Sequence, residues 1–179
     1  MSHPIPFGAF ELIEPIGKGG MASVWRGRHL ASHIPVAVKV MTGSQALNPH
    51  FRAAFRNEIR ALAGLDHPGI VLLWDYGEVD GSIEVASSGR LSAGSPYLVM
   101  ELVSRGTLSQ LRQPLAWTDL KQLLLSMLDA LAYAHSRGVI HLDLKPANVL
   151  IAGAGDARAG LKLTDFGLAY IVGHTGRSS

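Results

Sequence analysis

His141-Leu142-Asp143-Leu144-Lys145-Pro146-Ala147-Asn148 is the most informative stretch of this 179-residue chain. Asp143 carries a carboxylate that can orient an attacking hydroxyl group and accept its proton. Lys145 can neutralise negative charge on a group in transfer, and Asn148 offers a neutral oxygen to a magnesium ion. The alternating leucines would also fit a half-buried strand that ends at the proline. The stretch therefore indicates either a catalytic loop or a plain strand end.

Asp165-Phe166-Gly167 follows shortly after this stretch, at the end of a strand pattern over Leu161–Thr164. By itself the tripeptide also fits a strand that ends in a turn. The other interpretation is a functional carboxylate at Asp165, placed directly after a strand.

A glycine-rich stretch, Gly17-Lys18-Gly19-Gly20-Met21-Ala22-Ser23-Val24, lies near the N-terminus between two strand patterns. Glycine lets backbone amides approach phosphate oxygens without an intervening side chain. An ordinary turn between two strands is the alternative interpretation. The stretch alone does not decide between them.

Lys39 lies in an apolar strand pattern, where an unpaired ammonium group would be costly. Glu58 lies in the middle of an apolar helical stripe formed by Phe51, Phe55 and Leu62. No basic residue stands three or four positions from Glu58, so a local ion pair does not explain it. We therefore expect Lys39 and Glu58 to pair. The alternatives are an edge-strand lysine that reaches solvent and a glutamate that does the same.

These stretches, in this order from about Phe7 onward, resemble the eukaryotic-type serine/threonine protein kinase family. The segment Gly19-Gly20-Met21-Ala22 resembles its bacterial members. The resemblance implies an α+β, protein-kinase-like fold, with an antiparallel β-sheet N-lobe that holds one helix and the beginning of a mostly helical C-lobe. It predicts an N-lobe over residues 1–103 and a partial C-lobe over 104–179, truncated after the Asp165 segment. It also implies that Phe166 packs between the lobes.

The resemblance also implies roles for individual residues. Asp143 would be the base and Lys145 would assist transfer, while Lys39, braced by Glu58, would hold the α and β phosphates of ATP. Asn148 and Asp165 would bind Mg²⁺. The remaining nucleotide-binding residues implied are Ile16, Gly17, Lys18, Gly19, Gly20, Val24, Ala37, Met100, Glu101 and Val103.

The implied function is transfer of the γ-phosphoryl group of ATP to serine or threonine of protein substrates, in bacterial signalling. Two other functions stay open: an inactive regulatory pseudokinase, and a kinase of small molecules such as aminoglycosides or choline. A second copy of the chain stays open as a dimer or autophosphorylation partner. Two positions depart from the family pattern: Ala22 replaces its third glycine, and Leu142 replaces a common arginine. That arginine usually meets an activation-loop phosphate, so we expect activity independent of one, although Thr175, Ser178 and Ser179 are placed where such sites occur.

Composition excludes several other classes of protein. The chain is 47% hydrophobic and 17% charged, which is enough apolar content for a packed core. A net charge of +2 with scattered basic residues argues against nucleic acid as a partner. The chain has no cysteine, which fits a cytoplasmic location, and it shows no signal peptide or membrane segment. No histidine pair has the spacing of metal ligands.

Local patterns predict the remaining elements. Asn48 and Pro49 begin a helix that ends near Gly64. We expect further strands over 71–74, 97–100, 149–151 and 161–163, a long mobile loop over 79–95 and a loose connection over 152–160. We expect Thr118 to cap a strong helix that ends at Gly138. One apolar stripe of this helix is expected to be partly exposed, and the chain alone is expected to have low stability.

Overall fold

The computed structural model describes residues 3–166 and divides the chain into two compact units. Unit 1 comprises Met1–Arg56 and Leu73–Leu102, and unit 2 comprises Asn57–Leu72 and Val103–Ser179. Gly167 lies outside the described residues, as do Thr175, Ser178 and Ser179.

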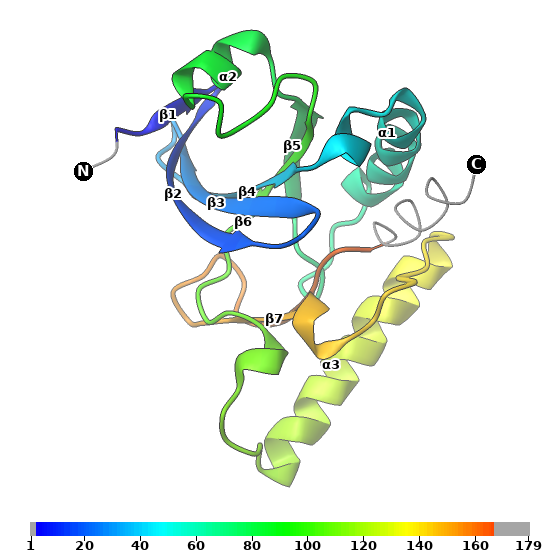
Figure 1. Cartoon of the computed structure of the whole chain (residues 1–179). Helices are drawn as coiled ribbons and strands as arrows, with labels where there is room; N and C mark the ends of the chain where they lie inside the picture. The colour runs from blue at the N-terminus through cyan, green and yellow to red at the C-terminus, as the bar shows by residue number, and fades with distance from the viewer. Residues whose placement is uncertain (1–2, 167–179) are drawn as a thin grey trace. The chain divides into compact units, whose positions relative to one another are not determined.

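Unit 1 is built on a six-stranded antiparallel sheet with strand order β1-β2-β3-β4-β6-β5 (Figure 1). The strands are β1 Ile5–Phe7, β2 Phe10–Lys18, β3 Ala22–His29, β4 Pro35–Met41, β5 Leu73–Glu78 and β6 Pro96–Glu101. The predicted strands are confirmed, although β5 begins two residues later than the apolar run that indicated it. Apolar alternation indicated β2, β3 and β4, and continuous apolar runs indicated β5 and β6.

Strand β4 is an inner strand, paired with β3 on one side and with β6 on the other. The interpretation of Lys39 as an edge-strand lysine is therefore wrong. Val36, Val38 and Val40 are buried in the core of unit 1, and Ala37 and Lys39 alternate with them on the opposite face of the sheet. The sheet thus has one core face and one face that carries Lys39.

The segment over 79–95, expected to be a long mobile loop, contains a helix, so that prediction is wrong. Helix α2 spans Gly81–Ala86, and the Asp80 carboxylate caps it by accepting a hydrogen bond from the Ile83 backbone N–H at 2.9 Å. Ile83 and Leu91 are buried in the core of unit 1, beside β1. Apolar burial at these points holds the segment against the sheet.

Helix α1 spans Pro49–Ala63 and follows the short 3-10 helix η1, Ser44–Leu47. As predicted, Asn48 caps it, and its side-chain oxygen accepts a hydrogen bond of 2.9 Å from the His50 backbone N–H. The most buried side chains of α1 are Phe51, Phe55 and Ile59.

In unit 2, helix α3 spans Trp117–Ser136. Its N-cap is Ala116, without a side-chain hydrogen bond, so the predicted cap at Thr118 is wrong. The predicted end is confirmed, since Gly138 adopts a φ of 74°. The backbone N–H groups of Gly138 and Val139 donate to the carbonyls of His135 and Ala134, at 2.9 and 3.0 Å. This is the Schellman arrangement, in which glycine avoids the cost of a left-handed conformation.

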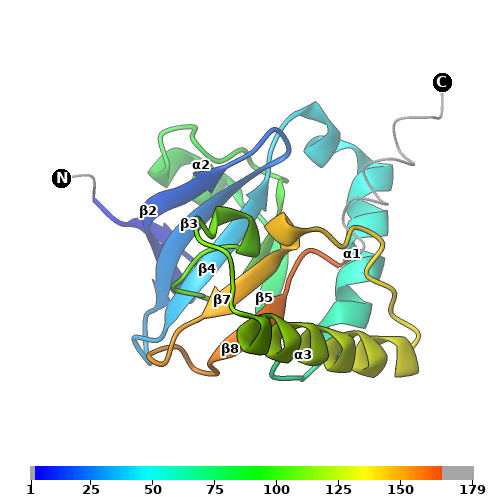
Figure 2. The same ribbon diagram turned by 90° about the horizontal axis from the view of Figure 1, so that it is seen from below.

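Strands β7, Val149–Ala152, and β8, Gly160–Leu163, form an antiparallel hairpin that lies alongside α3 (Figure 2). Two further 3-10 helices, η2 over Leu108–Gln110 and η3 over Pro146–Asn148, complete the unit. The core contains Leu163, Val149, Ala130 and Phe166 among its buried residues.

The connection between β7 and β8 is tied down, contrary to the expected loose loop. The Asp156 carboxylate accepts hydrogen bonds from the Gly153 N–H at 2.7 Å and from the N–H and hydroxyl of Ser104 at 3.1 and 2.9 Å. Burial alone would raise the pKa of Asp156, but these hydrogen bonds outweigh it and the pKa is lowered. The carboxylate thus stays ionised and fastens the loop to the start of the segment that follows β6.

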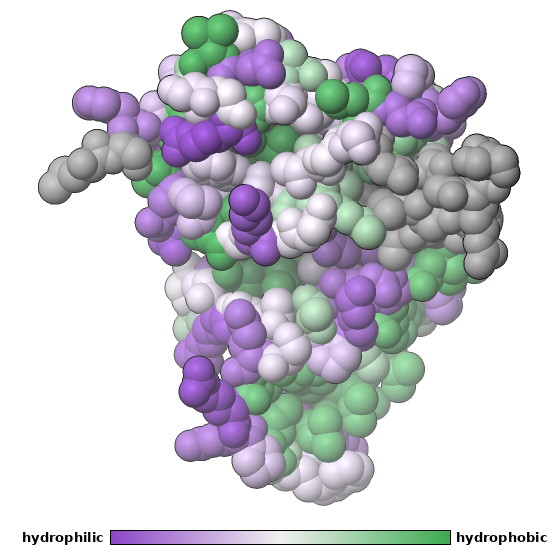
Figure 3. All heavy atoms as spheres, in the orientation of Figure 1, coloured by the Kyte–Doolittle hydropathy of each residue, from purple (hydrophilic) through white to green (hydrophobic). Residues whose placement is uncertain are grey.

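Part of the apolar surface of α3 is exposed, as expected. Ala130 and Ala134 are buried and Leu123 and Met127 pack against the core, but three leucines of α3 face solvent: Leu124, Leu125 and Leu128. Figure 3 shows apolar side chains gathered over this helix. No helix in the described part of the chain combines the length and apolar character needed to cross a bilayer.

Candidate active site

The glycine-rich stretch forms the tip of the β2–β3 hairpin. Gly17 pairs with Val24, and the Gly19 N–H donates to the Ala22 carbonyl at 2.8 Å. A Cβ atom placed on Gly20 would meet nothing within 4 Å, and one on Gly19 would make only an ordinary contact. The chain's own packing therefore does not require glycine at the tip. Close approach of a ligand to the backbone would require it.

Cross-strand register brings the predicted nucleotide residues of the sheet to one face. Val24 lies opposite Lys39, and Ala37 lies opposite Met100. Residues directly opposite each other in an antiparallel pair point to the same face. These four side chains therefore share the sheet face that is turned away from the core of unit 1, with Lys39 half-buried among apolar neighbours.

Leu98 also belongs to this face, because it lies opposite Lys39 on β6. Motif comparison missed it, although its spacing of two residues from Met100 could have indicated it.

Ile16 is 44% exposed near the hairpin tip. Glu101 lies opposite Val36, so its buried side chain belongs to the core face. Its predicted contribution is a backbone hydrogen bond, as is that of Val103, and both stay predictions.

In unit 2, the side chains of Asp143, Lys145 and Asn148 come together. The Lys145 ammonium donates to Asp143 Oδ2 at 2.7 Å. The Asn148 amide nitrogen donates to the same oxygen at 3.0 Å and to the Asp143 carbonyl at 2.9 Å. The Lys145 hydrogen bond, aided by Asn148, lowers the pKa of Asp143 below its usual value. Asp143 is therefore an oriented, ionised carboxylate at neutral pH, as a general base requires.

Asn148 and Asp165 lie at the same end of the β7–β8 hairpin. Asn148 immediately precedes β7, and the Thr164 N–H after β8 donates to the Asn148 carbonyl at 3.0 Å. The Asn148 amide nitrogen is engaged by Asp143, so its side-chain oxygen is the atom available to a metal. An amide and a carboxylate oxygen fit Mg²⁺, which usually keeps water and phosphate oxygens as its other ligands. The described residues contain no cluster of three His, Cys, Asp or Glu side chains suited to a metal.

Two residues of these segments adopt a strained backbone conformation, as His33 and Ser88 do elsewhere in the described chain. Leu142 and Asp165 have φ values of 61° and 62°, in the left-handed region that non-glycine residues seldom adopt. Such conformations persist where the surrounding structure enforces them, and they often occur at functional sites. The Leu142 side chain, at the position of the family's arginine, is 57% exposed.

The buried ring of His141 packs beneath the segment that carries Asp143, a role that the motif did not indicate. Its side chain is 2% exposed, and its ring centroid lies 4.4 Å from that of Phe166. Among the described residues, its Nε2 atom has no hydrogen-bond partner. Burial lowers the pKa of His141, so the ring is neutral at pH 7. The signal that could have identified it is its place at the start of the stretch that also carries Asp143.

Glu58 is half-buried on α1, beside the buried stripe of Phe51, Phe55 and Ile59. Ile59 joins Phe51 and Phe55 in the buried stripe, whereas Leu62, which the sequence placed there, is only partly buried. Lys39 belongs to unit 1 and Glu58 to unit 2, so their pairing stays a prediction.

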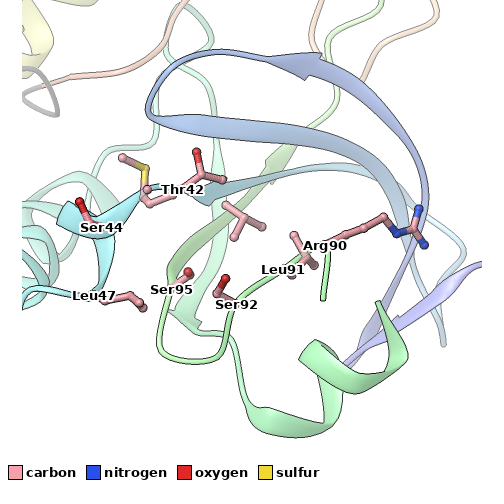
Figure 4. A pocket seen from close by; sticks show the side chains of 10 residues that line it. Thr42, Ser44, Leu47, Arg90, Leu91, Ser92 and Ser95 are labelled. Carbon is pink, nitrogen blue, oxygen red and sulfur yellow. The ribbon is translucent and has the colours of Figure 1, made fainter. Parts of the chain in front are cut away.

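A separate cavity of about 350 Å³ lies in unit 1, at the end of β4 (Figure 4). Its lining includes Thr42, Leu47, Leu91 and Ser95, and none of the predicted nucleotide residues. Arg90 also borders the cavity, but its guanidinium extends away and lies 5.4 Å from the centroid of the Trp25 ring. The cavity is therefore distinct from the Lys39 face.

Comparison with known proteins identifies the family of this chain. The sequence profile of the protein kinase domain matches residues 10–178. The chain belongs to the protein kinase family. It is 37% identical over 172 residues to the serine/threonine-protein kinase PknB of Mycolicibacterium smegmatis, and 36% identical over 172 residues to that of Mycobacterium tuberculosis. Each match covers 94% of this chain and 25% of the relative, so the chain spans about a quarter of these relatives' length.

Solved structures agree with this membership. The kinase domain of Mycobacterium tuberculosis PknI superposes with a TM-score of 0.74 at 25% sequence identity. The superposition covers 94% of this chain and 63% of that domain. The predicted fold, a kinase-like α+β arrangement with an antiparallel N-terminal sheet, is thereby confirmed.

Proposed function

We propose that this chain takes part in ATP-dependent transfer of a phosphoryl group to serine or threonine residues of protein substrates. The observation that carries the proposal is the Asp143 carboxylate, held by Lys145 and Asn148 at the hairpin end that also bears Asp165. Relatives named serine/threonine-protein kinases support the same reaction class.

The residues of unit 2 supply the chemistry at the acceptor. Asp143 orients the substrate hydroxyl and accepts its proton, and Lys145 stabilises negative charge as the phosphoryl group moves. The side-chain oxygens of Asn148 and Asp165 hold Mg²⁺. When bound, Mg²⁺ neutralises the charge of the ATP phosphates.

The residues of unit 1 hold the nucleotide. Backbone amides of the tip from Gly17 to Gly20 contact phosphate oxygens, and the Lys39 ammonium neutralises the α and β phosphates. Glu58 keeps Lys39 in place as its ion-pair partner. The adenine ring contacts the apolar side chains beside Lys39, and backbone groups of residues 101–103 bind its edge.

The sequence that follows the catalytic aspartate favours protein hydroxyls as acceptors, because Lys145-Pro146 is typical of serine/threonine kinases. We further propose a cytoplasmic location, a second copy of the chain as an autophosphorylation partner and activity that does not require a phosphate on the activation segment. Leu142 cannot pair with such a phosphate, because it has no charge.

The proposal is tested with Asp143→Asn, which keeps the shape of the side chain and removes the base. We expect phosphorylation of a serine/threonine peptide mixture to fall by a factor of about 10² to 10⁴, the usual contribution of a general base. Binding of Mg²⁺–ATP, measured by calorimetry, stays as in the parent. Asp119→Asn, a change of an exposed carboxylate in the first turn of α3, is the matched control and leaves both quantities unchanged.

Three results would contradict the proposal. The parent chain could fail to bind Mg²⁺–ATP. It could bind without transferring phosphate, which selects a regulatory module. It could phosphorylate aminoglycosides or choline instead of peptides, which selects a small-molecule kinase.

A further inference from the structure

The carboxylate of Glu78, the last residue of β5, contacts two arginines of helix α1. Arg52 forms two hydrogen bonds with its carboxylate, one from Nε to Oε1 at 3.0 Å and one from Nη2 to Oε2. Arg56 Nη1 lies 3.4 Å from Oε1. The side chains of Glu78 and Arg52 are 26% and 30% exposed, and all three residues belong to unit 1. None of them is part of the sequence motifs.

This cluster is better placed to fix a helix than an ordinary surface ion pair. Two parallel hydrogen bonds between arginine and a carboxylate add geometric specificity as well as energy. The arginines stand four residues apart, so they leave the helix on the same side. A Cβ atom on Gly94 would lie 3.6 Å from Arg52 Nη1, so the loop before β6 passes beside this guanidinium.

The position of the arginines on the helix ties them to Glu58. At about 100° per residue, Phe51, Phe55 and Ile59 form one buried stripe. By the same rule, Arg52 and Arg56 lie on one margin of this stripe, and Glu58 lies on the opposite margin. A rotation of α1 that releases the arginines from Glu78 must therefore also turn Glu58 away from its present direction.

We propose that Glu78 is a positioning residue for phosphoryl transfer: by holding Arg52 and Arg56 it sets the rotation of α1, and thereby the direction in which Glu58 points. The proposal rests on the proposed function, in which Glu58 braces Lys39. Glu78 itself touches neither nucleotide nor substrate in this mechanism.

The first test measures the helix without any ligand. The chain has no cysteine, so two introduced cysteines can carry spin labels at unique positions. Ala53→Cys on α1 and Val85→Cys on α2 are both exposed and both in unit 1. Pulsed EPR should give a narrow distance distribution in the labelled parent and a broadened or displaced one after Glu78→Gln. Glu11→Gln, which removes the partner of Arg28 on the sheet, is the matched control and leaves the distribution unchanged.

The second test asks whether Glu78 acts through Glu58. We expect Glu78→Gln to weaken Mg²⁺–ATP binding about five-fold, which is within the usual range of coupling between sites. In a Glu58→Gln background the same change should cause no further loss, because the group it positions is already gone. Glu78→Asp, which can still accept both arginines, should restore most of the affinity.

The outcomes separate this proposal from the proposed function. An unchanged EPR distribution in Glu78→Gln, or equal losses of affinity with and without Glu58, would overturn the positioning role. A parent that binds no nucleotide would overturn the proposed function, while the EPR result would still decide whether Glu78 sets the helix. If Glu78→Gln does not fold, Arg56→Gln, which removes the more exposed partner, is measured in the same way.

Discussion

The neutral, buried ring of His141 predicts how stability depends on pH. Burial lowers the pKa of His141 in the folded chain below the ordinary value of 6.5, although Asp143 and Asp165 oppose this by favouring the charged ring. The unfolded chain therefore binds a proton at higher pH than the folded chain does, and stability falls as the pH drops below about 6.5. Urea unfolding between pH 5 and 8 should show this loss.

His141→Phe keeps a ring against Phe166 and removes the titrating group. We expect the pH dependence of the unfolding free energy to flatten in this variant. His50→Gln removes an exposed histidine at the start of α1 and should leave the dependence unchanged. A parent whose stability stays constant from pH 8 to pH 5 would contradict the interpretation of His141.

At the same scale, sequence could identify residues whose chemistry is fixed by a motif, but not those that act through packing. Asp143 and Asn148 were selected by type and spacing, and the structure places their side chains in contact. Leu98 and His141 were missed because an apolar or neutral side chain acquires its role only from the sheet register or the core around it. The pairing of Lys39 with Glu58 stays a prediction.

The C-terminal end of α3 depends on the left-handed conformation of Gly138, which has a φ of 74°. Gly138→Ala should lower the unfolding free energy by about 1 kcal/mol, since a side chain is disfavoured there even though no atom blocks the new Cβ. Gly81→Ala is the matched control, because Gly81 opens α2 with equal space and without a positive φ. Thermal unfolding should show a lower melting temperature for the first variant and no loss for the second.

Equal melting temperatures for both variants would show that the Schellman turn does not need glycine.

Elements with a long apolar period were predictable, and short ones were not. The strands of the sheet and the helices α1 and α3 repeat their apolar residues often enough to show a period of two or about 3.6. Helix α2 has six residues, of which only Ile83 is buried, so no period could appear. Its glycine and serine neighbours favoured a loop, and its docking comes from burial of Ile83 and Leu91 against residues distant in sequence. The start of α3 was misplaced because Ala116 provides no side-chain cap.

Across the whole molecule, each unit has its own apolar core, and α3 carries both core and exposed leucines. Leu123 packs against the core of unit 2, whereas Leu125 and Leu128 are 51% and 58% exposed. Exposed apolar surface of this kind promotes self-association. The two classes of leucine on one helix should therefore respond differently to the same substitution.

We expect the double variant Leu125→Gln and Leu128→Gln to stay monomeric at higher concentrations than the parent in analytical ultracentrifugation. Its stability should change by no more than about 0.5 kcal/mol per site, the usual range for surface positions. Leu123→Gln should instead lower the unfolding free energy by about 1–3 kcal/mol, since it removes apolar contacts and brings an amide into the core. Unchanged association in the double variant would mean that this helix face is not what brings copies together, and equal stability losses at all three leucines would mean that α3 packs through a different face.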